Sequence, residues 1–242
     1  MVIFAFDFSI NKPAATIMRT KGDSIFGNPT FMTWPSSLTK KEKETYYSLM
    51  YPEDPRETGF LYCCRDLEAI SKASSLSTSE MALEHTKRSV ELAERIVMDL
   101  DELAGGDPDV YFVSEGLAFN SKGNSSLDLA TYKGVLMAYM YKKFPSLKIY
   151  TYAPMTIKSV AGCAKKDKAG DKHAMIKAFL EEEGFVKDNI FWKALKEGKL
   201  SYVKEKGKAK GEIEYIHCVD DIVDSYFAMK TLIAKENISS YQ

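Results

Sequence analysis

A carboxylate interrupts the first apolar segment of the chain, and it constrains the fold more than any other feature of the sequence. The segment "FAFDFSI", from Phe4 to Ile10, has the composition of a buried β-strand, and Asp7 lies in its middle. Alternate residues of a strand face opposite sides, so Asp7 shares a face with Ala5 and Ser9. Small neighbours leave room for an ion or a ligand. The alternative is a structural acid that caps a turn or pairs with a buried lysine.

Size and composition predict one large soluble domain without a marked preference for polyanions. The chain has 242 residues, a formal net charge of -1 and a pI of about 6.4, so a site for nucleic acid must come from local clustering of charge. We expect no signal peptide and no membrane span. The cysteines form no C-x-x-C pair, which argues against zinc and favours a cytoplasmic setting. They are Cys63, Cys64, Cys163 and Cys218.

The order of apolar segments predicts an α/β domain with a mixed sheet. A hairpin is expected from the first strand and the segment 14–20, and a third strand at 59–65. Between them, residues 21–56 read as irregular, so we treat about 21–78 as an ordered insertion after strand two. A helix with Ser79 as its N-cap precedes a strand at 109–116. The remaining expected elements are a helix at 125–142, a strand at 148–154, short helices, and a last helix from Asp220 to about 235.

Two further segments with candidate acids accompany that of Asp7. Glu115 closes the expected strand at 109–116, where it is either a ligand or an ordinary exposed acid. Asp221 and Asp224 are three residues apart and therefore share one face of the last helix. Asp220 competes with Asp221 for that role, although it also suits the N-cap. Acids in a first helical turn are common, but Asp224 lies among apolar residues.

Together these four acids could hold two divalent cations about 3.5–4 Å apart, an arrangement that hydrolyses phosphodiesters. Oxygen ligands favour Mg²⁺ or Mn²⁺ over zinc. A rigid strand would then fix Asp7 as a ligand, which explains an acid inside an apolar segment.

The layout resembles the ribonuclease H-like nuclease superfamily, and its details resemble the RuvC family of Holliday junction resolvases. Besides the acids, "SSLDLATYKG" (125–134) is similar to the family's Ser-x-x-Leu-x-Leu…Gly helix, and "YAPMTIKSVAG" (152–162) to its Tyr-Ala-Pro segment. The chain departs from the family after Asp7, where Phe8-Ser9 replaces Pro-Gly, and in the lengths of its insertions. These departures suggest a divergent branch, viral or organellar, and a viral member would act in the host-cell cytoplasm.

The resemblance implies a homodimeric, structure-selective DNA endonuclease that resolves four-way junctions by paired symmetric nicks. It implies Asp7, Glu115, Asp221 and Asp224 as catalytic residues and as ligands of two Mg²⁺ per site, replaceable by Mn²⁺. It implies no small-molecule cofactor and no membrane partner. For DNA backbone contact we predict a lysine-rich stretch, consisting of Lys158, Lys165, Lys168 and Lys172. A second lysine cluster at 199–210 is expected to be a solvated surface. Phe119 and Tyr132 could wedge bases, but core packing is expected.

Two other hypotheses remain open. One is another ribonuclease H-like nuclease acting on flaps, terminase substrates or RNA–DNA hybrids as a monomer. The other is a junction-binding protein without catalysis, which would gain nothing from acids clustered near phosphates.

Overall fold

A single mixed sheet forms the centre of the structure. The computed structural model describes residues 1–9, 11–21, 24–36, 38–50, 60–62, 77–107, 109–116, 124–164, 173–205 and 210–240. The strand order is β4-β3-β2-β1-β5-β6, with β9 also on β3. The strands are β1 (Val2–Asp7), β2 (Ala14–Lys21), β3 (Ser24–Thr33), β4 (Phe60–Tyr62), β5 (Val110–Glu115), β6 (Lys148–Tyr152) and β9 (Ser239–Ser240).

The direction of the strands divides the sheet into two halves. β1, β2 and β3 are antiparallel neighbours, whereas β5 and β6 run parallel to β1. A parallel pair needs a crossover, which α3 (Thr78–Ala104) provides between β1 and β5, and α4 (Asn124–Lys143) between β5 and β6. The five central strands, in the order β3-β2-β1-β5-β6, confirm the predicted ribonuclease H-like architecture of a five-stranded mixed sheet flanked by helices. The strands β4 and β9 extend this sheet beside β3.

The third antiparallel strand lies elsewhere than the sequence indicated. It is β3, inside the segment that we predicted to be irregular, and α1 (Lys40–Met50) follows it there. Of the predicted strand at 59–65, the structure describes β4, which pairs parallel to β3 at the edge. The Gly and Pro residues of 22–35 hid β3, because they weaken the strand pattern without preventing pairing at this position.

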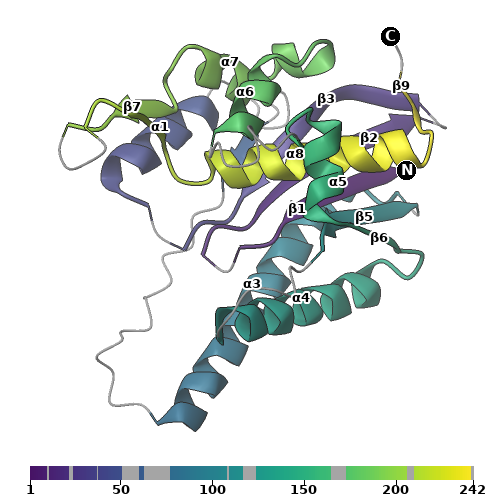
Figure 1. The fold of residues 1–242 in the computed structure, drawn as a ribbon. Coiled ribbons are helices and arrows are strands. Elements are labelled where there is room, and N and C mark those ends of the chain that lie inside the picture. The colour runs from purple at the N-terminus through teal and green to yellow at the C-terminus, as the bar shows by residue number, and fades with distance from the viewer. Residues whose placement is uncertain are drawn as a thin grey trace.

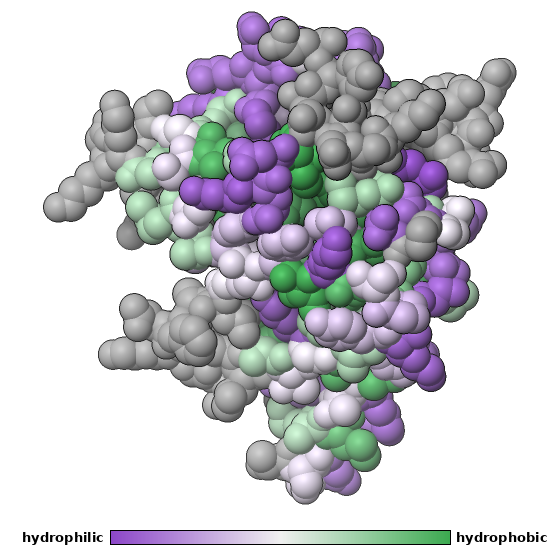
Figure 2. Space-filling view, turned by 90° about the vertical axis from the view of Figure 1, so that its right-hand side faces the viewer, coloured by the Kyte–Doolittle hydropathy of each residue, from purple (hydrophilic) through white to green (hydrophobic). Residues whose placement is uncertain are grey.

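Helices cover both faces of the sheet (Figure 1). Val2, Phe4 and Phe6 of β1 face a core shared with α3 and α4. Ile3 and Ala5 face the opposite core, where α8 (Val219–Lys235) crosses the sheet. Burial on both faces explains why β1 is apolar up to Asp7. Because side chains alternate along a strand, Asp7 lies on the same face as Ile3 and Ala5. Seen from the end that carries the N-terminus, the surface mixes hydrophilic and apolar residues (Figure 2), as folded surfaces do.

Shorter elements complete the face with α8. They are α5 (Pro154–Val160), α6 (Ala174–Leu180), the 3-10 helix η1 (Phe185–Asp188), α7 (Ile190–Lys196) and a separate two-stranded sheet of β7 (Ser201–Val203) and β8 (Ile213–Tyr215). None of the described helices has both the length and the apolar composition that a bilayer span requires.

Both predicted helix N-caps shift by about two residues. Ser77 caps α3 through a capping box with Glu80, so Ser79 lies inside the helix. Cys218 is the N-cap residue of α8, with a φ of 75° and no side-chain hydrogen bond, so Asp220 and Asp221 both lie in the first turn. The sequence favoured Asp220 because acids are good caps, but the chain enters α8 through the left-handed residue Cys218 instead.

Candidate active site

Two of the predicted acids end adjacent parallel strands. Asp7 is the last residue of β1 and Glu115 the last residue of β5. The register pairs Phe6 with Ser114, immediately before both acids. Parallel strands in register bring their carboxyl ends to the same edge of the sheet, so Asp7 and Glu115 are neighbours there.

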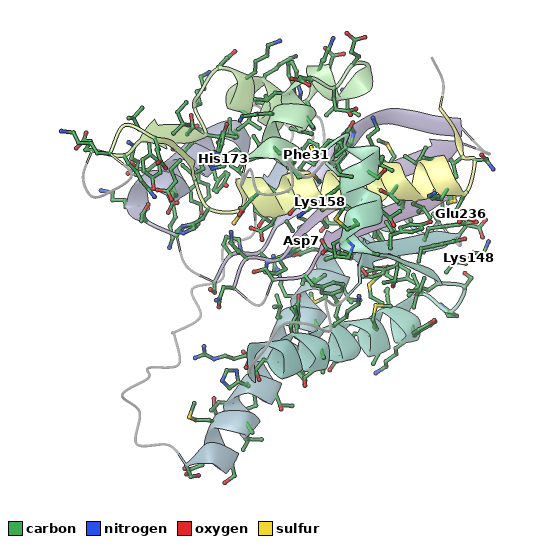
Figure 3. The ribbon with its side chains drawn as sticks, in the orientation of Figure 1. Asp7, Phe31, Lys148, Lys158, His173 and Glu236 are labelled. Atoms are coloured by element: carbon green, nitrogen blue, oxygen red, sulfur yellow. The ribbon has the colours of Figure 1, made fainter. Side chains whose placement is uncertain are left out.

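Helix α8 brings the other two acids to this edge. Asp221 lies in its first turn and Asp224 one turn later, on the side that packs against β1, β2 and β5. Asp221, Asp224 and Glu115 all lie close enough to Asp7 to raise its pKa. The structure therefore brings together all four predicted acids, from three separate segments of the chain; Figure 3 labels Asp7 at the centre of this region.

Burial and mutual repulsion raise the pKa values of these acids. Burial is the largest cause for Asp7, whose pKa is well above its usual value, and the charges of Asp221 and Asp224 add to it. Burial likewise raises the pKa of Asp221 and that of Glu115. For Asp224, burial followed by the charge of Glu115 raises the pKa to about 7. Ionising these carboxylates together is therefore unfavourable. A cation bound between them would offset their mutual repulsion and favour the ionised form.

Asp220 differs from Asp221 in its surroundings. Its side chain is about half exposed, whereas the side chain of Asp221 is 9% exposed. Burial would raise the pKa of Asp220, but the ammonium of Lys12 lowers it below its usual value. Asp221 rather than Asp220 faces Asp7, so the geometry favours Asp221 as the residue that acts with Asp7.

Two lysines that the sequence did not single out border the acids. Lys12 lies in the turn between β1 and β2, and its Nζ is 3.0 Å from Asp220 Oδ1 and 2.8 Å from Asp221 Oδ2. Lys133 of α4 donates to Ser114 Oγ at 3.0 Å and to the Glu115 carbonyl at 3.1 Å. A signal for Lys12 existed, because Asn11-Lys12-Pro13 is a turn directly after the strand of Asp7. No local sequence signal indicated Lys133, because its partners Ser114 and Glu115 belong to β5 and not to its own helix.

Of the predicted DNA-binding lysines, the structure describes Lys158. It lies on α5 (Figure 3), and its positive charge partly lowers the pKa values of Glu115 and Asp224, which burial raises. The other three, Lys165, Lys168 and Lys172, lie outside the described residues, as do Phe119, Cys63 and Cys64. Tyr132 is 1% exposed and its ring meets that of Phe8 edge-on, which confirms that it belongs to the core.

The donor set fits a hard divalent cation. All four side chains offer carboxylate oxygens, and Oδ2 of Asp221 is buried without a hydrogen bond of normal geometry. Among the described residues, no three His, Cys, Asp or Glu side chains are arranged to hold one ion by themselves. Mg²⁺ does not require that, since it is usually bound by one or two carboxylates with waters and substrate phosphates.

Comparisons with known proteins find similarity in structure and none in sequence. No protein-family model matches the chain, and no curated protein is significantly similar to it. Among solved structures, the chain is similar to Thermus thermophilus RuvC, with 10% identity, 98% of both chains covered and a TM-score of 0.46. It is also similar to T. thermophilus RuvC in complex with Holliday junction substrate (9%, 99% of both chains, 0.46).

A third similar structure is the yeast mitochondrial Holliday junction resolvase, Ydc2, with 10% identity, 95% of this chain and 76% of that chain covered, and a TM-score of 0.47. The ribonuclease H-like fold of the present chain is assigned from its own strand order and register.

Proposed function

We propose that this protein is a metal-dependent DNA endonuclease that resolves four-way junctions. The observation that carries the proposal is the meeting of Asp7, Glu115, Asp221 and Asp224 at one sheet edge, with raised pKa values. Such a cluster destabilises a protein that has no cation to place there. The junction as substrate rests on the resemblance of the sequence motifs.

The four carboxylates would hold two Mg²⁺, which when bound activate a water and stabilise the leaving oxygen of the phosphodiester. The chain itself supplies rigidity, because Asp7 and Glu115 end paired strands and Asp221 and Asp224 belong to a buried helix. Lys158 would contact the DNA backbone beside the acids, and its charge offsets their repulsion of phosphate.

The proposed active form is a homodimer, since a four-way junction is two-fold symmetric and receives two nicks. After one face of the helix is buried, the sequence of α4 leaves surplus apolar residues that suit a self-complementary interface, namely Leu127, Leu136, Met137, Tyr139, Met140 and Tyr141. Two of them are used otherwise, because Leu136 and Met140 are fully buried in the core of the protomer. Tyr139 donates a hydrogen bond from its hydroxyl to Glu94, and Tyr141 remains exposed. Sedimentation that shows only monomer while junctions are still resolved would exclude the dimer.

Incubation with labelled four-way, flap, RNA–DNA hybrid and linear substrates tests the function directly. We expect paired nicks in the four-way junction with Mg²⁺ and none in EDTA, with Asp7→Asn as the inactive control. Preferred cleavage of a flap or hybrid would favour the other nuclease hypothesis, and tight junction binding without cleavage in any metal would favour a binding protein.

A further inference from the structure

Lys12 places a positive charge inside the acidic site. Its Nζ lies between Asp220 and Asp221, at 3.0 and 2.8 Å from their carboxylate oxygens. The Asp221 oxygen involved is the buried Oδ2 that has no hydrogen bond of normal geometry. The Lys12 side chain is 29% exposed, so it reaches the acids from the rim of the site. Lys12 thus supplies the positive charge that balances this buried carboxylate oxygen.

The backbone around Lys12 is fixed by main-chain hydrogen bonds, whereas its side chain is held through the two ion pairs with Asp220 and Asp221. The carbonyl of Asn11 accepts the N–H of Ser36 at 2.6 Å, and the carbonyl of Pro13 accepts that of Trp34 at 2.9 Å. These bonds tie both sides of the turn to the chain after β3. A lysine side chain has a flexible four-carbon stem, so the ammonium can leave Asp221 without rearrangement of the fold.

The other basic residues of the site do not share this arrangement. Lys133 is anchored to Ser114 and to the carbonyl of Glu115. Lys158 acts on Glu115 and Asp224 through its charge. Lys12 is the lysine with a direct ionic contact to Asp221 in the described part of the chain.

We propose that Lys12 is a displaceable counter-cation, which neutralises Asp221 in the metal-free protein and must leave when a divalent cation binds that carboxylate. The proposal rests on the assignment of Asp221 as a metal ligand in the proposed function. An ammonium and a divalent cation at one carboxylate oxygen repel each other, so the two states exclude each other. The released ammonium lies at the rim, where a DNA phosphate would approach, so metal binding also prepares a cation for the substrate.

Lysine reactivity in the wild-type protein measures the displacement without any mutation. An amine-acetylating reagent and mass spectrometry would compare Lys12 in EDTA and in saturating Mn²⁺, without DNA. If Lys12 is ion-paired in about nine molecules of ten, its release raises the free fraction, and hence the acetylation rate, up to roughly tenfold. Lys40, whose side chain is 92% exposed on α1, is the control and keeps its rate.

Mn²⁺ binding by calorimetry gives the reciprocal measurement. Lys12→Met removes the competitor, so the apparent dissociation constant is expected to fall roughly tenfold by the same fraction. Lys12→Arg retains the charge and stays near wild type. Lys204→Met, which removes a lysine paired with Glu214 outside the site, leaves the affinity unchanged. Circular dichroism confirms that each variant is folded.

The outcomes separate this inference from the proposed function. Unchanged Lys12 reactivity in saturating Mn²⁺ overturns the inference, even if Lys12→Met binds Mn²⁺ more tightly, because a general charge effect would then suffice. Junction cleavage with unchanged Lys12 reactivity refutes the inference alone. Release of Lys12 without cleavage of any substrate supports the inference and refutes the nuclease. A wild-type protein that binds no Mn²⁺ overturns both.

Discussion

Glu42 on α1 holds His217, four residues before Asp221, through two contacts. Its Oε1 accepts the backbone N–H of His217 at 3.1 Å and lies 3.0 Å from Nδ1 of the same residue. Tyr46, one turn later on α1, donates its hydroxyl to the His217 carbonyl. The chain then passes through the left-handed residue Cys218 into α8. Helix α1 therefore fixes the segment that aims the first turn of α8 at the acidic site.

Glu42→Gln should destabilise the protein at neutral pH. Burial would raise the pKa of Glu42, but hydrogen bonds from Thr39 and His217 lower it overall. A lowered pKa contributes stability above the unfolded value near 4.5, and this contribution is lost as the pH falls through the folded value. We expect a loss of about 1.5–3 kcal/mol at pH 7, and less below pH 4, from urea unfolding. Glu44→Gln, on the exposed side of α1, should cost almost nothing; an equal loss would contradict the role of Glu42.

Asp224→Asn should stabilise the protein in EDTA, because it removes a carboxylate with a raised pKa. Burial and then the charge of Glu115 raise that pKa from 3.8 to about 7. A raised pKa means that the wild type loses stability as the pH rises from about 4 through 7. At pH 8 the variant should gain about 2–4 kcal/mol, and at pH 4 little. Thermal unfolding at both pH values measures this, with exposed Asp188→Asn as control. A variant less stable at pH 8 would contradict the repulsion.

Replacement of the acids should abolish cleavage while binding of the junction persists. Asp7→Asn, Glu115→Gln and Asp224→Asn each remove charge that holds the cations, not a contact to phosphate. We expect at least a 100-fold loss of cleavage in Mg²⁺ and near-normal junction affinity in Ca²⁺, by gel shift. Near wild-type cleavage by Asp7→Asn would show that the site is wrongly assigned.

Asp220→Asn should be milder than Asp221→Asn in the same cleavage assay. Asp220 is half exposed and paired with Lys12, whereas Asp221 is buried and faces Asp7. The reverse order would move the helical ligand by one residue.

Lys158→Ala should weaken binding to junction and duplex alike and should flatten the salt dependence. Each lysine that contacts phosphate contributes about 0.9 to the slope of log affinity against log salt, so the variant should lose about that amount in a titration in Ca²⁺. Lys204→Ala is the matched control, because its ammonium is paired with Glu214 at 2.9 Å. Equal slopes for wild type and Lys158→Ala would remove Lys158 from the DNA-binding surface.

The sequence by itself predicted the class of fold and the four acids of the candidate site. The alternation of Asp7 with small residues, the end of a strand at Glu115 and the spacing of Asp221 and Asp224 are local features, and local periodicity reports which face a side chain takes. It also determined both crossover helices. It did not reveal β3, because pairing with β2 outweighs the weak strand pattern of a segment that contains Gly and Pro.

Only the tertiary structure decided which residues surround the acids. Lys12, Lys133 and Glu42 act on partners from 18 to 209 positions away in the chain, and no local pattern reports such pairings. The tertiary structure also distinguished Asp221 from Asp220. Both lie in the same helical turn, but the packing of α8 against β1 buries Asp221 and leaves Asp220 exposed. The chain enters this helix through the left-handed residue Cys218, a conformation that the sequence pattern did not indicate.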